Sequence, residues 1–193
     1  AGAMQTPGCV LIAGTGSICY GKNAAGEHFR CGGGGHIIDD PGSGYALGRD
    51  ALAAALQTED GRLSENALHG AVMDTVGGSG IQGIFDFVYF SRRGKGDIAA
   101  LAPLVLQCAA QGDAVSLDIL RRGAAELARL VSAVMGKLGL ENGSPCALAG
   151  GLLAEDNVYR RAVCAALAPF CRPAAPEHDA LFGAVQLALA AIQ

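Results

Sequence analysis

Glycine is concentrated in the early part of this chain. The sequence has 29 glycines among 193 residues, and they crowd into residues 8–48, where short apolar stretches alternate with turns. Three such stretches, at residues 9–13, 17–20 and 28–31, have strand-like composition, and the turn-forming residues 23–26 suit a hairpin loop. The pattern predicts three consecutive antiparallel strands.

Apolar residues at three- and four-residue spacing predict two helices after these strands. The first helix is expected to begin near Tyr45 and to end at residues 60–61. Ser64 is expected to cap the second helix, which runs to about Val76 and is broken by the glycines of residues 77–80.

Two further helices are predicted in the middle of the chain. Asp97 is a good N-cap for a helix over residues 98–110. The longest predicted helix follows residues 112–113 and ends at Gly139. Its expected buried stripe consists of Leu117, Leu120, Ala124, Leu127, Val131, Val134 and Leu138. We expect this helix to be the structural spine.

The last part of the chain alternates between strand and helix. Residues 145–149 are apolar and are followed at once by residues 150–151, both glycine, which predicts a buried strand turning sharply into a helix over residues 155–167. A weaker strand at residues 171–174 and a final helix from Glu177 complete the pattern. This order of elements predicts an α/β layer architecture in one domain.

Composition limits the classes of function. A net charge of -4 without a long cluster of Lys and Arg gives no electrostatic footprint for nucleic acid. No apolar run reaches the roughly 18 residues that a membrane span needs. Seven scattered cysteines without CxxC spacing argue against a zinc site or a disulfide framework, and favour a reducing cytoplasm. Small-molecule partners are therefore favoured.

Two glycine turns are candidates for binding an anion. The first turn consists of Gly14, Thr15, Gly16 and Ser17. Consecutive N–H groups in such a turn can cradle phosphate oxygens, with the two hydroxyls as added donors, although a plain hairpin turn is the alternative. Gly150 and Gly151 open space at the carboxyl end of a strand, where open α/β sheets usually bind ligands. A tight strand-to-helix packing turn is the alternative there.

A third candidate is the glycine-dense segment of residues 31–45. A globular protein tolerates such a segment mainly where the backbone lies close to a ligand or another chain. Asp39 and Asp40 near its end could bind sugar hydroxyls or a magnesium-bound water, or could serve turn formation and helix capping. A lone histidine such as His36 is more often a structural hydrogen-bonding residue than a catalyst. The absence of GxxxxGK[ST] excludes the phosphate-loop NTPase class.

The order and spacing of these elements resemble the C-terminal half of the BadF/BadG/BcrA/BcrD ATPase family, in its N-acetylglucosamine kinase branch. Residues 11–20, 32–52, 112–113 and 148–157 carry the resemblance. It implies one lobe of the ribonuclease-H-like, actin-like ATPase fold, with three N-terminal antiparallel strands, strand–helix repeats and inserted helices. In that fold, ATP and the sugar lie in the cleft between two lobes.

The resemblance also implies roles for individual residues. Such proteins transfer the γ-phosphoryl group of MgATP to a sugar hydroxyl, so ATP, Mg²⁺ and an amino sugar are the expected cofactors and substrate. The implied phosphate-binding residues are Gly14, Thr15, Gly16 and Ser17; the implied adenosine-binding residues are Gly150 and Gly151; the implied sugar-side residues are Gly33, Gly34 and Asp40. No metal ligand or catalytic residue is assigned, because the base is expected in an N-terminal lobe that residues 1–193 lack.

The chain departs from the family pattern at two positions near the sugar. Family kinases usually carry an aromatic residue where this chain has Gly34 and an acid where it has Pro41, so an altered sugar pocket is expected. One alternative function is the ATPase activator of a radical dehydratase or reductase, but such activators supply a cluster cysteine where this chain has Leu11. The other is a stand-alone binding or assembly module whose apolar face is covered by a second copy, as in a homodimer.

Overall fold

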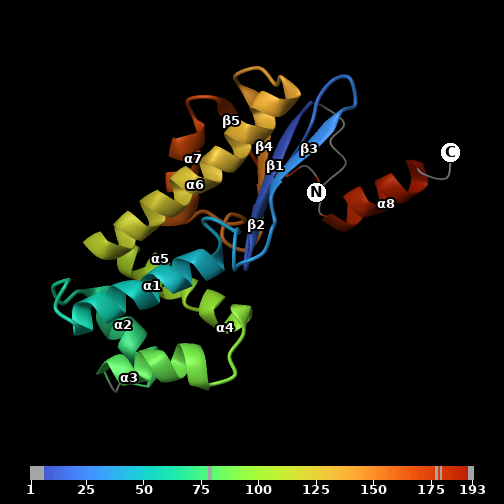
Figure 1. Cartoon of the computed structure of the whole chain (residues 1–193). Helices are drawn as coiled ribbons and strands as arrows, with labels where there is room; N and C mark the ends of the chain where they lie inside the picture. The colour runs from blue at the N-terminus through green and yellow to red at the C-terminus, as the bar shows by residue number, and fades with distance from the viewer. Residues whose placement is uncertain (1–6, 78–79, 177, 179, 191–193) are drawn as a thin grey trace.

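A five-stranded mixed sheet forms the centre of the computed structural model, which describes residues 7–77, 80–176, 178 and 180–190 (Figure 1). The sheet order is β3-β2-β1-β4-β5. The strands are β1 (Gly8–Ala13), β2 (Ser17–Lys22), β3 (His28–Gly32), β4 (Ser144–Ala149) and β5 (Cys171–Ala174). The first three strands are antiparallel, as predicted, whereas β4 runs parallel to β1 and β5 runs parallel to β4.

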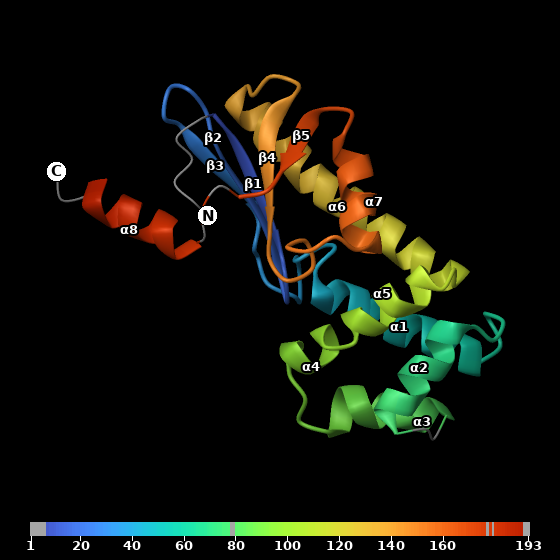
Figure 2. The ribbon, with the colours of Figure 1, turned by 180° about the vertical axis from the view of Figure 1, so that it is seen from behind.

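The helices form two groups around this sheet. They are α1 (Gly44–Glu59), α2 (Ala67–Val76), α3 (Gly80–Phe85), the π-helical turn η1 (Asp86–Phe90), α4 (Lys95–Ala99), α5 (Ala102–Ala110), α6 (Ala114–Leu138), α7 (Val158–Leu167) and α8 (Ala180–Ala190). Figure 2 shows α6 and α7 against the sheet, and α1 to α5 gathered beyond one end of the strands. The inserted helices therefore form a separate layer beside the strand ends.

Helix α6 is the structural spine that the sequence predicts. Its residues Leu120, Leu127, Val131 and Val134 are buried in the hydrophobic core. The prediction is wrong for Leu117, which is 41% exposed near the start of the helix, where α6 extends past the strands. Because the buried stripe has the 3.6-residue period of a helix, one face of α6 covers the sheet along most of its length.

A row of cysteines crosses the face of the sheet that α6 covers. Each strand contributes one residue to this row, in the order Cys31, Cys19, Cys9, Cys146 and Cys171. Gly21 on the same face lies so close to α6 that an added Cβ would be 2.5 Å from a methyl carbon of Val134. The pKa of Cys19 is raised by its contact with the Cys9 sulfur and by burial. All seven cysteines are free, and the buried ones serve as small apolar side chains.

Two predicted helix starts are wrong because a different side chain forms the cap. Asn66, rather than Ser64, caps α2, and its side chain accepts a hydrogen bond from the amide three residues later at 3.0 Å. Asn157 caps α7 in the same way at 2.8 Å, so this helix starts three residues later than predicted. Ser and Asn are similarly good N-caps, so composition alone did not distinguish them. Glu177, the predicted start of the last helix, lies outside the described residues.

The helix predicted over residues 98–110 is two helices. Asp97 is not the N-cap of α4 but lies in its first turn, where its carboxylate accepts a hydrogen bond from the Gly94 amide at 2.8 Å. Pro103 then stands in the first turn of α5. Because proline lacks an N–H and suits the first turn of a helix, it marks a new start rather than a helix interior.

Helix α8 stands apart from the other helices. Figures 1 and 2 show it on the side of the sheet away from α6 and α7. Its exposed apolar side chains include Leu181, Val185 and Leu189. In the part of the chain that the structure describes, no single helix is long and apolar enough to cross a membrane; Lys95–Ala110 and Ala114–Leu138 reach that length and composition only as a pair bent by 118°.

Candidate functional site

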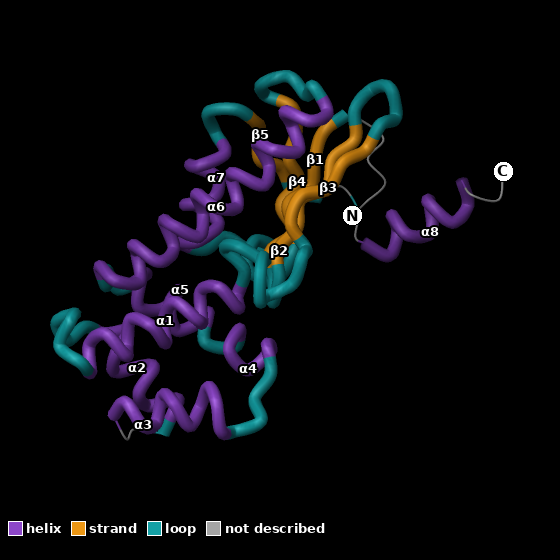
Figure 3. Tube along the Cα trace, in the orientation of Figure 1, coloured by secondary structure: helices purple, strands orange, loops and turns teal. Residues whose placement is uncertain are grey.

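The two predicted glycine turns lie side by side at one edge of the sheet. Strands β1 and β4 are parallel neighbours with Ile12 opposite Ala149, so both turns begin at the carboxyl ends of adjacent strands. An added Cβ on Gly14 would lie 3.9 Å from the amide nitrogen of Gly151. Figure 3 shows loops gathered at this end of the strands, between the sheet and α1. The fold thus brings together two segments that are far apart in sequence.

The first turn, residues 14–17, is fixed to the beginning of α1. The amides of Gly44 and Tyr45 donate hydrogen bonds to the carbonyls of Gly14 and Thr15, at 2.7 and 3.3 Å. Ser17 is buried, and its hydroxyl donates to the Pro41 carbonyl at 2.7 Å. This hydroxyl is therefore engaged within the protein.

Two amides of the first turn remain available. The N–H groups of Thr15 and Gly16 have no hydrogen-bond acceptor among the described residues, and Thr15 is exposed. Consecutive free amides in a turn are suitable donors for the oxygens of a phosphate or another anion. The available donors are therefore these two amides and the Thr15 hydroxyl.

The second turn depends on the backbone conformation of Gly150. Its φ is +89°, and an added Cβ would collide with the backbone of Ala13. The amide of Leu152 donates to the Ala13 carbonyl at 3.1 Å, which ties this turn to the end of β1. By contrast, Gly151 is exposed, and an added Cβ there would meet nothing within 4 Å. The second turn is closely packed on one side and open on the other.

Asp40 lies directly behind the first turn. It is 3% exposed, and its carboxylate accepts hydrogen bonds from the Ser17 amide at 3.1 Å and from Lys95 Nζ at 2.7 Å. An added Cβ on Gly16 would lie 2.9 Å from both carboxylate oxygens. Burial by itself raises the pKa of Asp40, but the bonds from Lys95 and Ser17 lower it by more, so the group stays ionised.

Lys95 is a site residue that the sequence analysis missed. It lies just before the helix predicted over residues 98–110, 55 residues from its partner. No local pattern marks such a contact, because the partner is fixed by the packing of α4 rather than by sequence spacing. The role of Asp40 on the sugar side stays a prediction, and both of its oxygens are engaged by protein donors.

The glycine-rich segment forms a folded loop. The Gly33 amide donates to the Ser17 carbonyl at 2.9 Å, and the Gly34 amide donates to the Asp39 carboxylate at 2.8 Å. At the end of the segment, the buried hydroxyl of Tyr159 on α7 donates to the Gly42 carbonyl at 2.6 Å. The segment is therefore anchored at both ends to the elements that carry the two turns.

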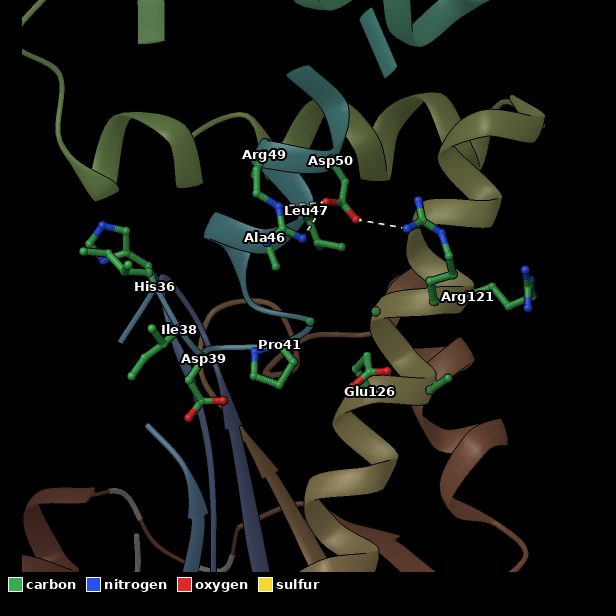
Figure 4. A pocket seen from close by; sticks show the side chains of 15 residues that line it. His36, Ile38, Asp39, Pro41, Ala46, Leu47, Arg49, Asp50, Arg121 and Glu126 are labelled. Carbon is green, nitrogen blue, oxygen red and sulfur yellow. Dashed lines mark hydrogen bonds and ion pairs between the residues drawn. The ribbon is translucent and has the colours of Figure 1, made fainter. Parts of the chain in front are cut away.

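A cavity of about 620 Å³ lies beside this segment. Figure 4 shows His36, Ile38, Asp39 and Pro41 on one side of it and residues of α1 and α6 on the other. The helix side chains labelled there are Ala46, Leu47, Arg49, Asp50, Arg121 and Glu126. Its arginines are paired with acids, as in the Arg49–Asp50 contact at 2.7 Å. The lining includes Asp39 and Pro41, on either side of Asp40, but not Gly33, Gly34 or Asp40 themselves, nor the two glycine turns.

Comparisons with known sequences show the family of the chain. The chain matches the family model of the BadF/BadG/BcrA/BcrD ATPases over residues 1–188. It is 40% identical over 141 residues to the N-acetylmuramic acid/N-acetylglucosamine kinase of Clostridium acetobutylicum, covering 73% of this chain and 46% of that protein. It is 31% identical over 159 residues to the N-acetyl-D-glucosamine kinase of Dictyostelium discoideum, covering 81% and 48%. The chain thus spans about half the length of these curated relatives.

Solved structures resemble the whole fold. A protein from Chromobacterium violaceum, assigned as an N-acetylglucosamine kinase, matches 94% of this chain and 59% of its own, with a TM-score of 0.74 and 32% identity. Its counterpart from Porphyromonas gingivalis matches the same shares with a TM-score of 0.69 and 19% identity, which shows likeness of fold alone. The chain belongs to the BadF/BadG/BcrA/BcrD ATPase family, in its N-acetylglucosamine kinase-like branch, and has the mixed α/β, actin-like ATPase fold of that branch.

Proposed function

We propose that this chain is the C-terminal, ATP- and sugar-facing lobe of a kinase that phosphorylates an amino sugar. One observation carries the proposal: glycine turns 14–17 and 150–151 meet at the carboxyl ends of adjacent parallel strands. The names of the relatives support the substrate class. Because the chain spans about half of their length, the activity is proposed for the complete protein, with the base on an N-terminal lobe.

The free amides of the first turn suit the phosphates of ATP. Phosphoryl transfer depends on positioning and on neutralising charge, which the Thr15 and Gly16 amides would supply. Gly151 leaves open space next to them for the adenosine. Magnesium would enter with ATP as the MgATP substrate, because the Asp40 carboxylate is buried and already bonded to Lys95 and to the Ser17 amide.

The acceptor is proposed to lie against the glycine-rich segment. Gly33 and Gly34 are adjacent to the first turn through the Gly33–Ser17 hydrogen bond. Without a side chain at Gly34, this wall offers backbone rather than an aromatic face to the sugar. The activator alternative is not favoured, because the matched relatives carry kinase names. A homodimer and a cytoplasmic location remain proposals, the latter supported by free thiols.

A substitution at Gly151 tests the nucleotide site. An added Cβ there meets nothing within 4 Å, so Gly151→Leu should leave the fold intact while filling the space proposed for adenosine. In the complete protein, measured by coupled ADP release with N-acetylglucosamine or N-acetylmuramic acid, we expect KM for ATP to rise about tenfold or more, with KM for the sugar little changed.

Gly136→Leu is the matched control for this experiment. Gly136 is an exposed glycine on α6 whose added Cβ also meets nothing within 4 Å. This variant should keep the wild-type KM for ATP. An unchanged KM for ATP in Gly151→Leu, or no phosphorylation of any amino sugar by the complete protein, would contradict the proposed function.

A further inference from the structure

A lysine from the inserted helices reaches the carboxylate behind the first turn. Lys95 Nζ lies 2.7 Å from the carboxylate of Asp40, and the two side chains are 32% and 4% exposed. A buried carboxylate is costly unless it is paired and hydrogen-bonded. The ion pair therefore joins the helical layer to the turn that ends β1.

The backbone around Lys95 is held in place by α1. Helix α4 lies so close to α1 that an added Cβ on Gly48 would collide with the Ile98 carbonyl, and one on Gly44 would lie 3.6 Å from the Cβ of Ala99. The Gly44 amide also donates to the Gly14 carbonyl at 2.7 Å. The first turn of α1 thus contacts both the glycine turn and the helix that carries Lys95.

Asp40 itself adopts an unfavourable backbone conformation. Its φ is +58°, a left-handed value that non-glycine residues rarely adopt and that costs free energy. Such a conformation persists where the surrounding contacts determine it. Here the contacts are the Ser17 amide, the close approach of Gly16 and the ammonium group of Lys95.

We propose that Lys95 is a positioning residue for the glycine turn: by neutralising Asp40, it keeps the carboxylate on the Ser17 amide and the turn in the shape that leaves the Thr15 and Gly16 amides open to an anion. The inference rests on the proposed function for the identity of that anion, a nucleotide phosphate. Lys95 acts through Asp40 and is assigned no contact with the substrate.

Hydrogen exchange of the Ser17 amide, followed by NMR on the 193-residue chain, tests the positioning role without nucleotide. In Lys95→Met this amide should exchange about tenfold faster than in the wild type, whereas Lys95→Arg should restore the wild-type rate. Lys22→Met, at the exposed far end of β2, is the control and should leave the rate unchanged. If Lys95→Met does not fold, Lys95→Gln is measured instead. An unchanged Ser17 rate in the folded variant overturns the proposal.

Binding of MgADP to the complete protein, measured by calorimetry, separates this inference from the proposed function. Lys95→Met should weaken binding about tenfold, and the loss should vanish when Asp40 is already replaced by Asn, because Lys95 acts through that carboxylate. Wild-type affinity in Lys95→Met, or a full further loss in the double variant, overturns the inference. If the wild-type complete protein binds no MgADP, the proposed nucleotide site fails, and the Ser17 exchange rate alone decides the positioning role.

Discussion

The two glycine turns lie next to each other but are stabilised in different ways. The first turn is held by polar side chains from distant parts of the chain, with Asp40 and Lys95 behind it and the Ser17 hydroxyl bonded to Pro41. The second is held by backbone contacts, above all the packing of Gly150 against the end of β1. The first turn should therefore respond to changes of charge, and the second to changes of volume.

The largest expected effect is at the second turn. Gly150→Ala forces a side chain into a left-handed conformation and into the backbone of Ala13, and should lower the free energy of unfolding by about 3 kcal/mol. Gly151→Ala, next to it, should change that free energy by less than about 0.5 kcal/mol. Urea unfolding measures both. Equal stability of the two variants would show that the second turn is not sensitive to added volume at Gly150.

A smaller loss is expected when the carboxylate behind the first turn is removed. Asp40→Ala leaves the buried Ser17 amide without its acceptor and should cost about 2 kcal/mol. Asp40→Gly should cost less by about 1 kcal/mol, because glycine adopts the left-handed φ without strain. Urea unfolding of both variants checks this order. The reverse order would show that the left-handed backbone is not strained at this position.

Helix α7, which follows the second turn, is an exception to the rule that backbone contacts alone hold this turn. The Asn157 side chain caps α7 and also donates to the Leu152 carbonyl at 3.0 Å, so one polar side chain does support the second turn. Asn157→Ala should cost about 1 kcal/mol in thermal unfolding. Asn157→Ser should recover most of this, since Ser is also a good cap. A loss as large as that of Gly150→Ala would mean that the second turn too depends on polar side chains.

The smallest expected effect is a dependence of stability on pH at the first turn. The folded pKa of Asp40 lies below its ordinary value of 3.8, so its contribution is fully present above about pH 4 and is lost as pH falls through the folded pKa. Lys95→Met should reduce this loss on acidification, and Lys22→Met should not. Unfolding in urea between about pH 6 and about pH 3 measures the slopes. Identical slopes in all three proteins would show that the ion pair is too well solvated to contribute.

Sequence reasoning succeeded where local pattern determines structure. One window of sequence contains the apolar period of α6, the short apolar run of residues 145–149 and the strand-like stretches of the early antiparallel strands. It failed at helix boundaries. The start of α2 is an example, because Ser64 and Asn66 are two positions apart and have similar capping ability. It also failed for Lys95, because an ion pair between residues 55 positions apart follows from the packing of α4 on α1.

The candidate site could be predicted only in part for the same reason. Each glycine turn is visible as a local motif, but their proximity depends on the parallel pairing of β1 with β4, between residues more than a hundred positions apart. The family resemblance implies that the two turns are close together, because it assigns both to one nucleotide, whereas the strand pairing itself was not predicted. The engagement of the Ser17 hydroxyl and the Asp40 carboxylate within the protein could not be read from either motif.

The row of cysteines across the sheet can be used to follow how the sheet becomes exposed during unfolding. Each strand carries one sulfur on the face of the sheet against which α6 and α7 pack, and within this row only Cys31 at the edge is partly accessible. Cys164 on α7 is also partly accessible, so a thiol reagent should modify Cys31 and Cys164 first, and should reach Cys19, Cys9 and Cys146 only when the covering helices separate from the sheet. Counting modified sulfurs by mass spectrometry during unfolding would then report, strand by strand, how far the sheet has been uncovered.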